Sequence, residues 1–117
     1  MDRAQSDRWS RARTEVMRRW ERIIERIQAR DEAGVMALAN VMDEFCEEAI
    51  ADRHGEPGNR CLFCKGFIES GGCHGILIDL NRAVLAGRWD EAKSAAEGYL
   101  RRLGTLSFAD PPESTIH

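Results

Sequence analysis

The sequence predicts an all-α protein in which two helical hairpins form a four-helix bundle-like domain. Apolar residues recur every three or four positions in four separate stretches of the chain. Each stretch is bounded by glycine, proline or a residue suited to capping a helix. At 117 residues the chain is long enough for one domain. We therefore expect a single helical domain over residues 1–104 and an extended or disordered tail over 105–117.

The first hairpin is predicted to consist of helices at about 8–30 and 32–53. The apolar residues of the first helix follow at intervals of 7, 4, 3 and 4: Trp9, Val16, Trp20, Ile23 and Ile27. Those of the second follow at intervals of 3, 4, 3 and 4: Val35, Leu38, Met42, Phe45 and Ala49. Asp31 is placed to cap the second helix. Gly55, Pro57 and Gly58 are placed to end it.

The second hairpin is predicted to consist of helices at about 73–86 and 89–103. The apolar residues of the third helix are Ile76, Leu77, Leu80, Val84 and Leu85. Those of the fourth are Trp89, Ala92, Ala96, Tyr99, Leu100 and Leu103. Gly87 separates the two helices, in the same way that a small residue and an arginine separate the first pair.

Charge divides the first hairpin into two parts of opposite sign. Residues 1–30 carry nine arginines against five acidic residues, and residues 31–53 carry seven acidic residues against one arginine. Two adjacent segments of opposite charge are expected to pair with each other. This pairing, together with the lack of any interleaving of aromatic and basic residues, makes nucleic acid an unexpected partner.

Unequal helix lengths suggest self-association. The first hairpin is longer than the second by roughly 10 Å, at 1.5 Å per residue. Trp9 and Val16 would lie on this overhang and would need another surface. We expect a protein partner or a second copy of the chain, giving a dimer. The alternative is that the C-terminal tail folds back over the overhang.

Four cysteines are the chemical feature of the chain: Cys46, Cys61, Cys64 and Cys73. The two-residue gap between Cys61 and Cys64 allows both thiolates to face one ion. Gly66 and the pair Gly71 and Gly72 give the backbone the freedom that a tight metal-binding loop needs. We therefore expect a metal-binding loop over 54–73, between the second and third helices.

Cys46 would complete the site from within the second helix, so the metal would join that helix, the loop and the start of the third helix. Cys73 would stand at the positive N-terminal end of the third helix, which favours a thiolate. Cys46 could instead be a buried core residue. In that case His54 or His74 is the candidate fourth ligand.

Zinc is the expected metal, because four thiolates form the closed shell that is typical of structural zinc. The alternative is an iron–sulfur cluster on the same cysteines, which would make the protein a redox- or iron-sensing regulator, and the absence of any metal is a third possibility. The order of one distant cysteine, a C-x2-C pair and a further cysteine is similar to that of the WhiB-like iron–sulfur regulators. That resemblance implies a redox-sensing helical protein that contacts a sigma factor. It covers the cysteine order alone, since this chain lacks the glycine–tryptophan turn and the basic tail of that family.

Enzymatic activity is not expected. The chain shows no Glu-x-x-His pairs for a di-iron site and no strand before Cys61 for a thioredoxin-like exchange site. It has no apolar run near the ~20 residues of a membrane span and no apolar segment of a secretory signal at its start, so a cytoplasmic location is expected. The sequence thus predicts a small metal-binding interaction, adaptor or regulatory module.

Overall fold

The computed structural model describes residues 3–41, 43–52 and 73–106, and within these ranges all regular secondary structure is α-helical. The helices are α1 (Arg3–Gln28), α2 (Glu32–Ala39), α3 (Glu44–Asp52), α6 (Cys73–Leu85) and α7 (Trp89–Gly104). The predicted all-α class is therefore confirmed for this part of the chain. The predicted loop over 54–73, apart from Cys73, and nearly all of the predicted tail lie outside the described residues.

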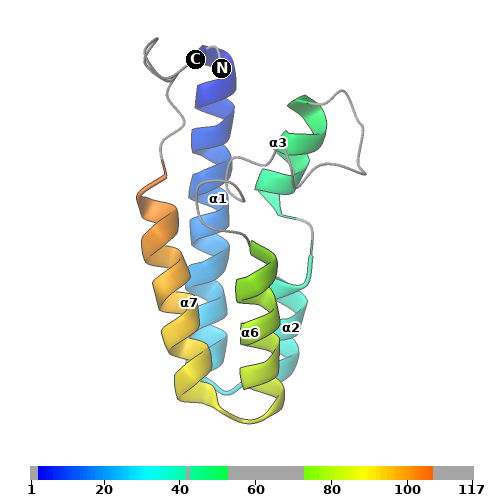
Figure 1. The fold of residues 1–117 in the computed structure, drawn as a ribbon, viewed down its shortest axis with the longest axis vertical. Helices are drawn as coiled ribbons and strands as arrows, with labels where there is room; N and C mark the ends of the chain where they lie inside the picture. Colours follow the sequence, from blue (N-terminus) through cyan, green and yellow to red (C-terminus); the bar gives the residue numbers. More distant parts are fainter. Residues whose placement is uncertain (1–2, 42, 53–72, 107–117) are drawn as a thin grey trace.

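The longest helix, α1, organises the molecule. It packs against α2, α3 and α7, while α6 packs against α7 and α2. Figure 1 shows α1, α2, α6 and α7 side by side with their axes close to the long axis of the molecule, and α3 beside the N-terminal half of α1. The described helices thus form a bundle-like arrangement in which α3 occupies a separate level.

The core consists largely of the apolar residues that periodicity predicts. All five residues of the α1 stripe are at most 4% exposed: Trp9, Val16, Trp20, Ile23 and Ile27. They pack with buried residues of the other helices, among them Val35, Phe45, Leu80, Ala96 and Tyr99. One expected core residue of the predicted third helix points outward instead, since Leu85 is 69% exposed.

The predicted helix over 32–53 is divided in two, which corrects the sequence-based expectation. Asn40 caps the C-terminal end of α2, and both its backbone N–H and its side-chain amide donate to the carbonyl of Met36. Asp43 then accepts the backbone N–H of Cys46 and begins α3. Asn and Asp side chains bond to nearby backbone groups, and this competes with continued helix.

The overhang argument for self-association is also corrected. Trp9 is 1% exposed and Val16 is not exposed at all, although α7 ends beside the middle of α1. The ring of Trp9 stacks on Phe45 of α3, with centroids 5.8 Å apart. Because α3 separates from α2 and lies along α1, the chain itself covers these residues. Self-association needs a different surface.

Candidate metal centre

Two of the four candidate cysteines are described, and each stands in the first turn of a helix. Cys46 is the third residue of α3, and Cys73 is the first residue of α6. Both are half-buried. Cys61, Cys64 and the alternative ligand His54 lie outside the described residues. The side chain of the other alternative, His74, also lies outside them, although its backbone belongs to α6.

Cys46 is held by the cap of α3. Its backbone N–H donates to Oδ1 of Asp43 at 2.9 Å, which fixes the first turn of the helix. Its neighbour Phe45 is 2% exposed and packs on Trp9 of α1. The residue therefore lies in a capped first turn, near the positive end of the α3 dipole. This setting differs from the expected one, in which Cys46 lies well inside a long helix.

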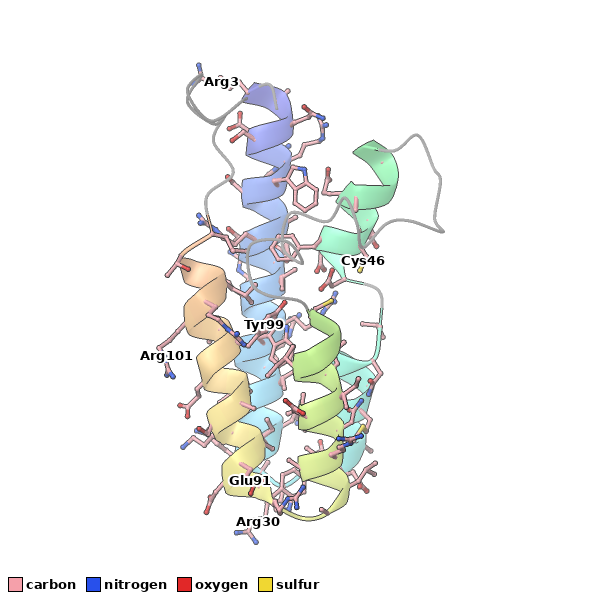
Figure 2. The ribbon with its side chains drawn as sticks, in the orientation of Figure 1. Arg3, Arg30, Cys46, Glu91, Tyr99 and Arg101 are labelled. Carbon is pink, nitrogen blue, oxygen red and sulfur yellow. The ribbon has the colours of Figure 1, made fainter. Side chains whose placement is uncertain are left out.

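Contacts with α1 fix the height of the first turn of α3 in the bundle. Glu44, the first residue of α3, forms an ion pair with Arg19, with 2.7 Å between Oε1 and the guanidinium. Trp20 follows Arg19 on α1, and the ring of Tyr99 from α7 packs edge to face against it, with ring centroids 4.8 Å apart. Cys46 is two residues beyond Glu44, or about 3 Å along the helix. Cys46 of α3 and Tyr99 of α7 thus lie at similar levels along the axis of α1, as Figure 2 shows.

The start of α6 reaches the same level. Figure 1 shows α6 and α7 running antiparallel from the turn at Gly87. Tyr99 is twelve residues after Gly87, so the residue of α6 opposite it lies about twelve residues before the turn, near Gly75. Cys73 is two residues further, or about 3 Å along the axis. The first turns of α3 and α6, with Cys46 and Cys73, therefore stand at similar heights.

Arginines of α1 balance the acidic residues that surround Cys46. Besides the pair of Arg19 and Glu44, Arg8 donates to Glu48 at 3.3 Å. The side chains of Arg19 and Glu44 are 17% and 29% exposed, so water screens this pair less than a surface pair. The expected pairing between the basic and acidic segments is confirmed at these two contacts. The two ion pairs join α3 to α1 at Glu44 and at Glu48, one turn apart on α3.

The carboxylate of Glu44 is only half satisfied. Its Oε1 accepts from Arg19, whereas its Oε2 is buried and has no hydrogen-bond partner among the residues that the structure describes. A buried carboxylate oxygen is stabilised by any nearby cation or N–H donor. The start of α3 is therefore a place where positive charge is favourable, two residues from Cys46.

Sequence reasoning missed the residues that build this region, although it found the cysteines. Asp43 caps α3, and Asn40 both caps α2 and bonds to Asn81 of α6. The available signal was the spacing of Asn40 and Asp43 around two apolar residues. An asparagine followed three residues later by an aspartate is consistent with one helix ending and another beginning.

Within residues 3–41, 43–52 and 73–106, no three His, Cys, Asp or Glu side chains lie close enough together to hold a metal ion. The two described cysteines therefore form no complete site by themselves. Among the same residues, no helix is both long and apolar enough to cross a membrane. A scan against protein-family models and searches of curated proteins and solved structures found no match to the chain.

Proposed function

We propose that this protein is a small, non-enzymatic interaction module whose helices are joined by a structural zinc ion on Cys46, Cys61, Cys64 and Cys73. The observation that carries the proposal is that Cys46 and Cys73, both half-buried, stand in the first turns of two helices, α3 and α6. Two half-buried cysteines at the positive ends of helices are well suited to act as thiolate ligands.

The C-x2-C pair supplies the other half of the site. Cys61 and Cys64 lie in the segment that connects α3 with α6. The nine residue-to-residue steps from Asp52 to Cys61 can span roughly 30 Å at 3.3 Å per residue, which is enough to return to the start of α3. Four thiolates complete a tetrahedral zinc shell and leave no position for a substrate. This supports a structural and interaction role over a catalytic one.

The net charge of a four-thiolate zinc site, −2, is compatible with the surrounding residues. Arg8 and Arg19 form ion pairs with Glu48 and Glu44, each of which is two residues from Cys46. Arg60 and Lys65 flank the C-x2-C pair in sequence and add two positive charges. The same ligands would suit an iron–sulfur cluster, so the experiment must distinguish the two metals.

The test is metal content per chain, measured by elemental analysis on protein purified without oxygen, together with its visible absorption spectrum. We expect one zinc per chain and no colour. Cys61→Ser and Cys64→Ser are expected to lose the metal and to unfold at lower temperature, because metal binding to small sites is coupled to folding. Iron with acid-labile sulfide would replace this proposal with that of a cluster-based sensor. Parent protein without metal would refute both.

Neighbouring residues provide the matched control. Cys73→Ser removes a proposed ligand, and His74→Ala changes the next residue of the same helix turn. We expect loss of zinc from the first variant only. Zinc lost from His74→Ala but retained in Cys46→Ser would make His74 the fourth ligand and Cys46 a core residue.

A further inference from the structure

The outer face of α6 carries exposed apolar residues that the fold does not use. Ile78 is 50% exposed and Leu85 is 69% exposed. They are seven residues apart, which is two helical turns, so they lie on one face of the helix. The described residues contain one other large apolar side chain that is exposed, Val41 at 51%.

Val41 belongs to the same face of the molecule. It follows Asn40, whose side chain exchanges two hydrogen bonds with Asn81 of α6, at 3.2 and 2.9 Å. Because α2 and α6 run antiparallel (Figure 1), the chain beyond Asn40 continues toward Ile78, which is one turn before Asn81. Val41, Ile78 and Leu85 thus form one surface, here called the α6 patch. Three exposed large apolar side chains on one face are available for contact with another molecule.

Two charged residues border the α6 patch on the side of α7. Asp79 and Arg82 are exposed, and neither forms an ion pair with another residue in the described part of the chain. Both line a shallow groove of about 360 Å³ between α6 and α7. Exposed apolar residues beside an unpaired acid and an unpaired base combine the two kinds of group that protein–protein contacts use.

We propose that the α6 patch binds a second copy of this chain, with the two α6 helices antiparallel about a twofold axis. The axis would pass between Asn81 and Arg82, which are midway between Ile78 and Leu85. Ile78 of each copy then packs against Leu85 of the other. This contact buries the two most exposed apolar residues of the helix together.

The charges agree with this arrangement. In the same register, Arg82 is level with Asn81 of the second copy, and Asp79 of that copy is two residues, or about 3 Å, away along the axis. An arginine side chain reaches this distance easily, so two symmetric ion pairs form between the two apolar contacts of Ile78 with Leu85. A single patch that supplies both partners of every contact is the signature of an isologous dimer.

The test is sedimentation equilibrium of the full-length protein over a range of concentrations, with each variant compared to the parent. We expect a parent dimer and a dissociation constant raised roughly 10- to 100-fold by Ile78→Asp or Leu85→Asp. Both positions are exposed, so folding and helix content should be unchanged. Ser94→Asp adds the same charge to an exposed position of α7 and should leave the dimer intact.

Charge reversal tests the orientation. Asp79→Arg alone should weaken the dimer, and Asp79→Arg with Arg82→Asp should restore it by exchanging the two signs. A parent that stays monomeric at all concentrations would overturn the proposal and leave the patch to another protein. A dimer that Ile78→Asp and Leu85→Asp do not weaken would overturn it as well. Zinc content is independent of these variants, so failure here and failure of the proposed metal site are distinguishable.

Discussion

The two hairpin turns at the base of the bundle have the same backbone geometry but different side chains. In the turn between α1 and α2, Arg30 and Asp31 donate backbone N–H groups to Ile27 and Arg26. In the turn between α6 and α7, Gly87 and Arg88 bond in the same pattern to Val84 and Ala83. Both are Schellman motifs followed at once by a new helix.

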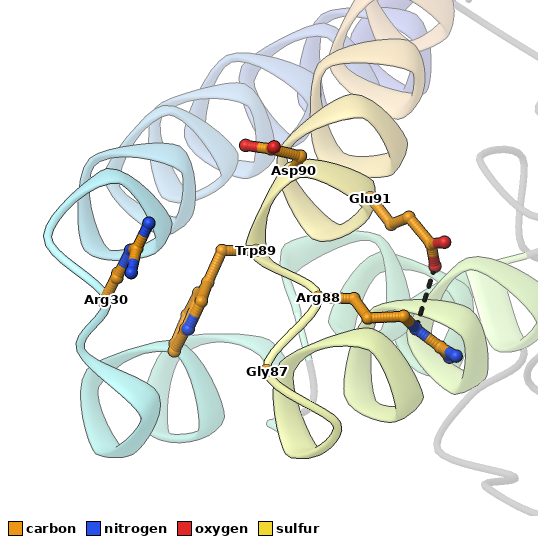
Figure 3. A pocket seen from close by; sticks show the side chains of 6 residues that line it. All are labelled: Arg30, Gly87, Arg88, Trp89, Asp90 and Glu91. Atoms are coloured by element: carbon orange, nitrogen blue, oxygen red, sulfur yellow. Dashed lines mark ion pairs between the residues drawn. The ribbon is translucent and has the colours of Figure 1, made fainter.

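The side chains of the two turns differ at two positions: the left-handed position after the first helix and the cap position before the second. The left-handed position has φ 54° at Arg30 and φ 73° at Gly87, so only the second turn uses glycine where glycine is favoured. The cap position is filled by Asp31, which accepts the N–H of Gly34, and by Arg88, which makes no side-chain cap. Figure 3 shows the two turns facing each other across a pocket of about 310 Å³. The turn at Arg30 is thus capped by Asp31 but strained at its left-handed position. The turn at Gly87 is unstrained but has no side-chain cap.

The largest effect is expected from Gly87→Ala, which should lower the free energy of unfolding by about 1–2 kcal/mol. A Cβ at Gly87 would meet no atom within 4 Å, so the cost comes from the backbone conformation alone. Arg30 is at the equivalent position of the other turn and already has a Cβ. Arg30→Ala should therefore change the free energy of unfolding by no more than about 0.5 kcal/mol. Urea unfolding of both variants checks the comparison, which fails if the two changes are equal.

The next effect concerns the caps. Asp31→Ala should cost about 1 kcal/mol, because it removes the acceptor for the N–H of Gly34, 3.0 Å away. Arg88→Ala removes only an exposed ion pair with Glu91, so it should cost about 0.2–0.5 kcal/mol. The same unfolding measurement compares the two. A larger loss from Arg88→Ala would show that α7 depends on this residue in another way.

The smallest expected change is an increase in the free energy of unfolding. Arg30→Gly relieves the left-handed strain but increases the conformational freedom of the unfolded chain, so the net stabilisation should be roughly 0.5 kcal/mol. Calorimetric melting temperatures of the parent and the variant provide the measurement. A variant that is less stable than the parent would mean that the Arg30 side chain contributes contacts that outweigh its backbone strain.

Apolar periodicity predicted the helices more reliably than it predicted their breaks. The stripe from Trp9 to Ile27 is buried as expected, and Cys73 begins a helix as expected. The division at 40–43 was not found, because the 3, 4, 3, 4 spacing from Val35 to Ala49 continues through it. Spacing reports which residues face the core, and two helices separated by a short turn can keep the same phase.

The candidate metal site was predictable only in its ligand types. Cysteine spacing identified Cys46 and Cys73, but it could not show that each lies in a first turn, because that depends on the cap at Asp43 and on the packing against α1. The opposite charges of the two segments predicted their attraction. The choice of Arg8 with Glu48 and Arg19 with Glu44 follows from the position of α3 along α1.

The separation of α3 from α2 allows one part of the molecule to open while the rest stays folded. Among the described helices, α3 packs chiefly on α1, and the contacts between them include one aromatic stack and two ion pairs. Because α3 packs chiefly on α1 and the break at 40–43 separates it from α2, it can detach while α1, α2, α6 and α7 remain folded, and it then behaves as a cooperative unit of its own. Any link that joins Cys46 to Cys73 would merge this unit with the rest, and local opening of α3 would then require unfolding of α6.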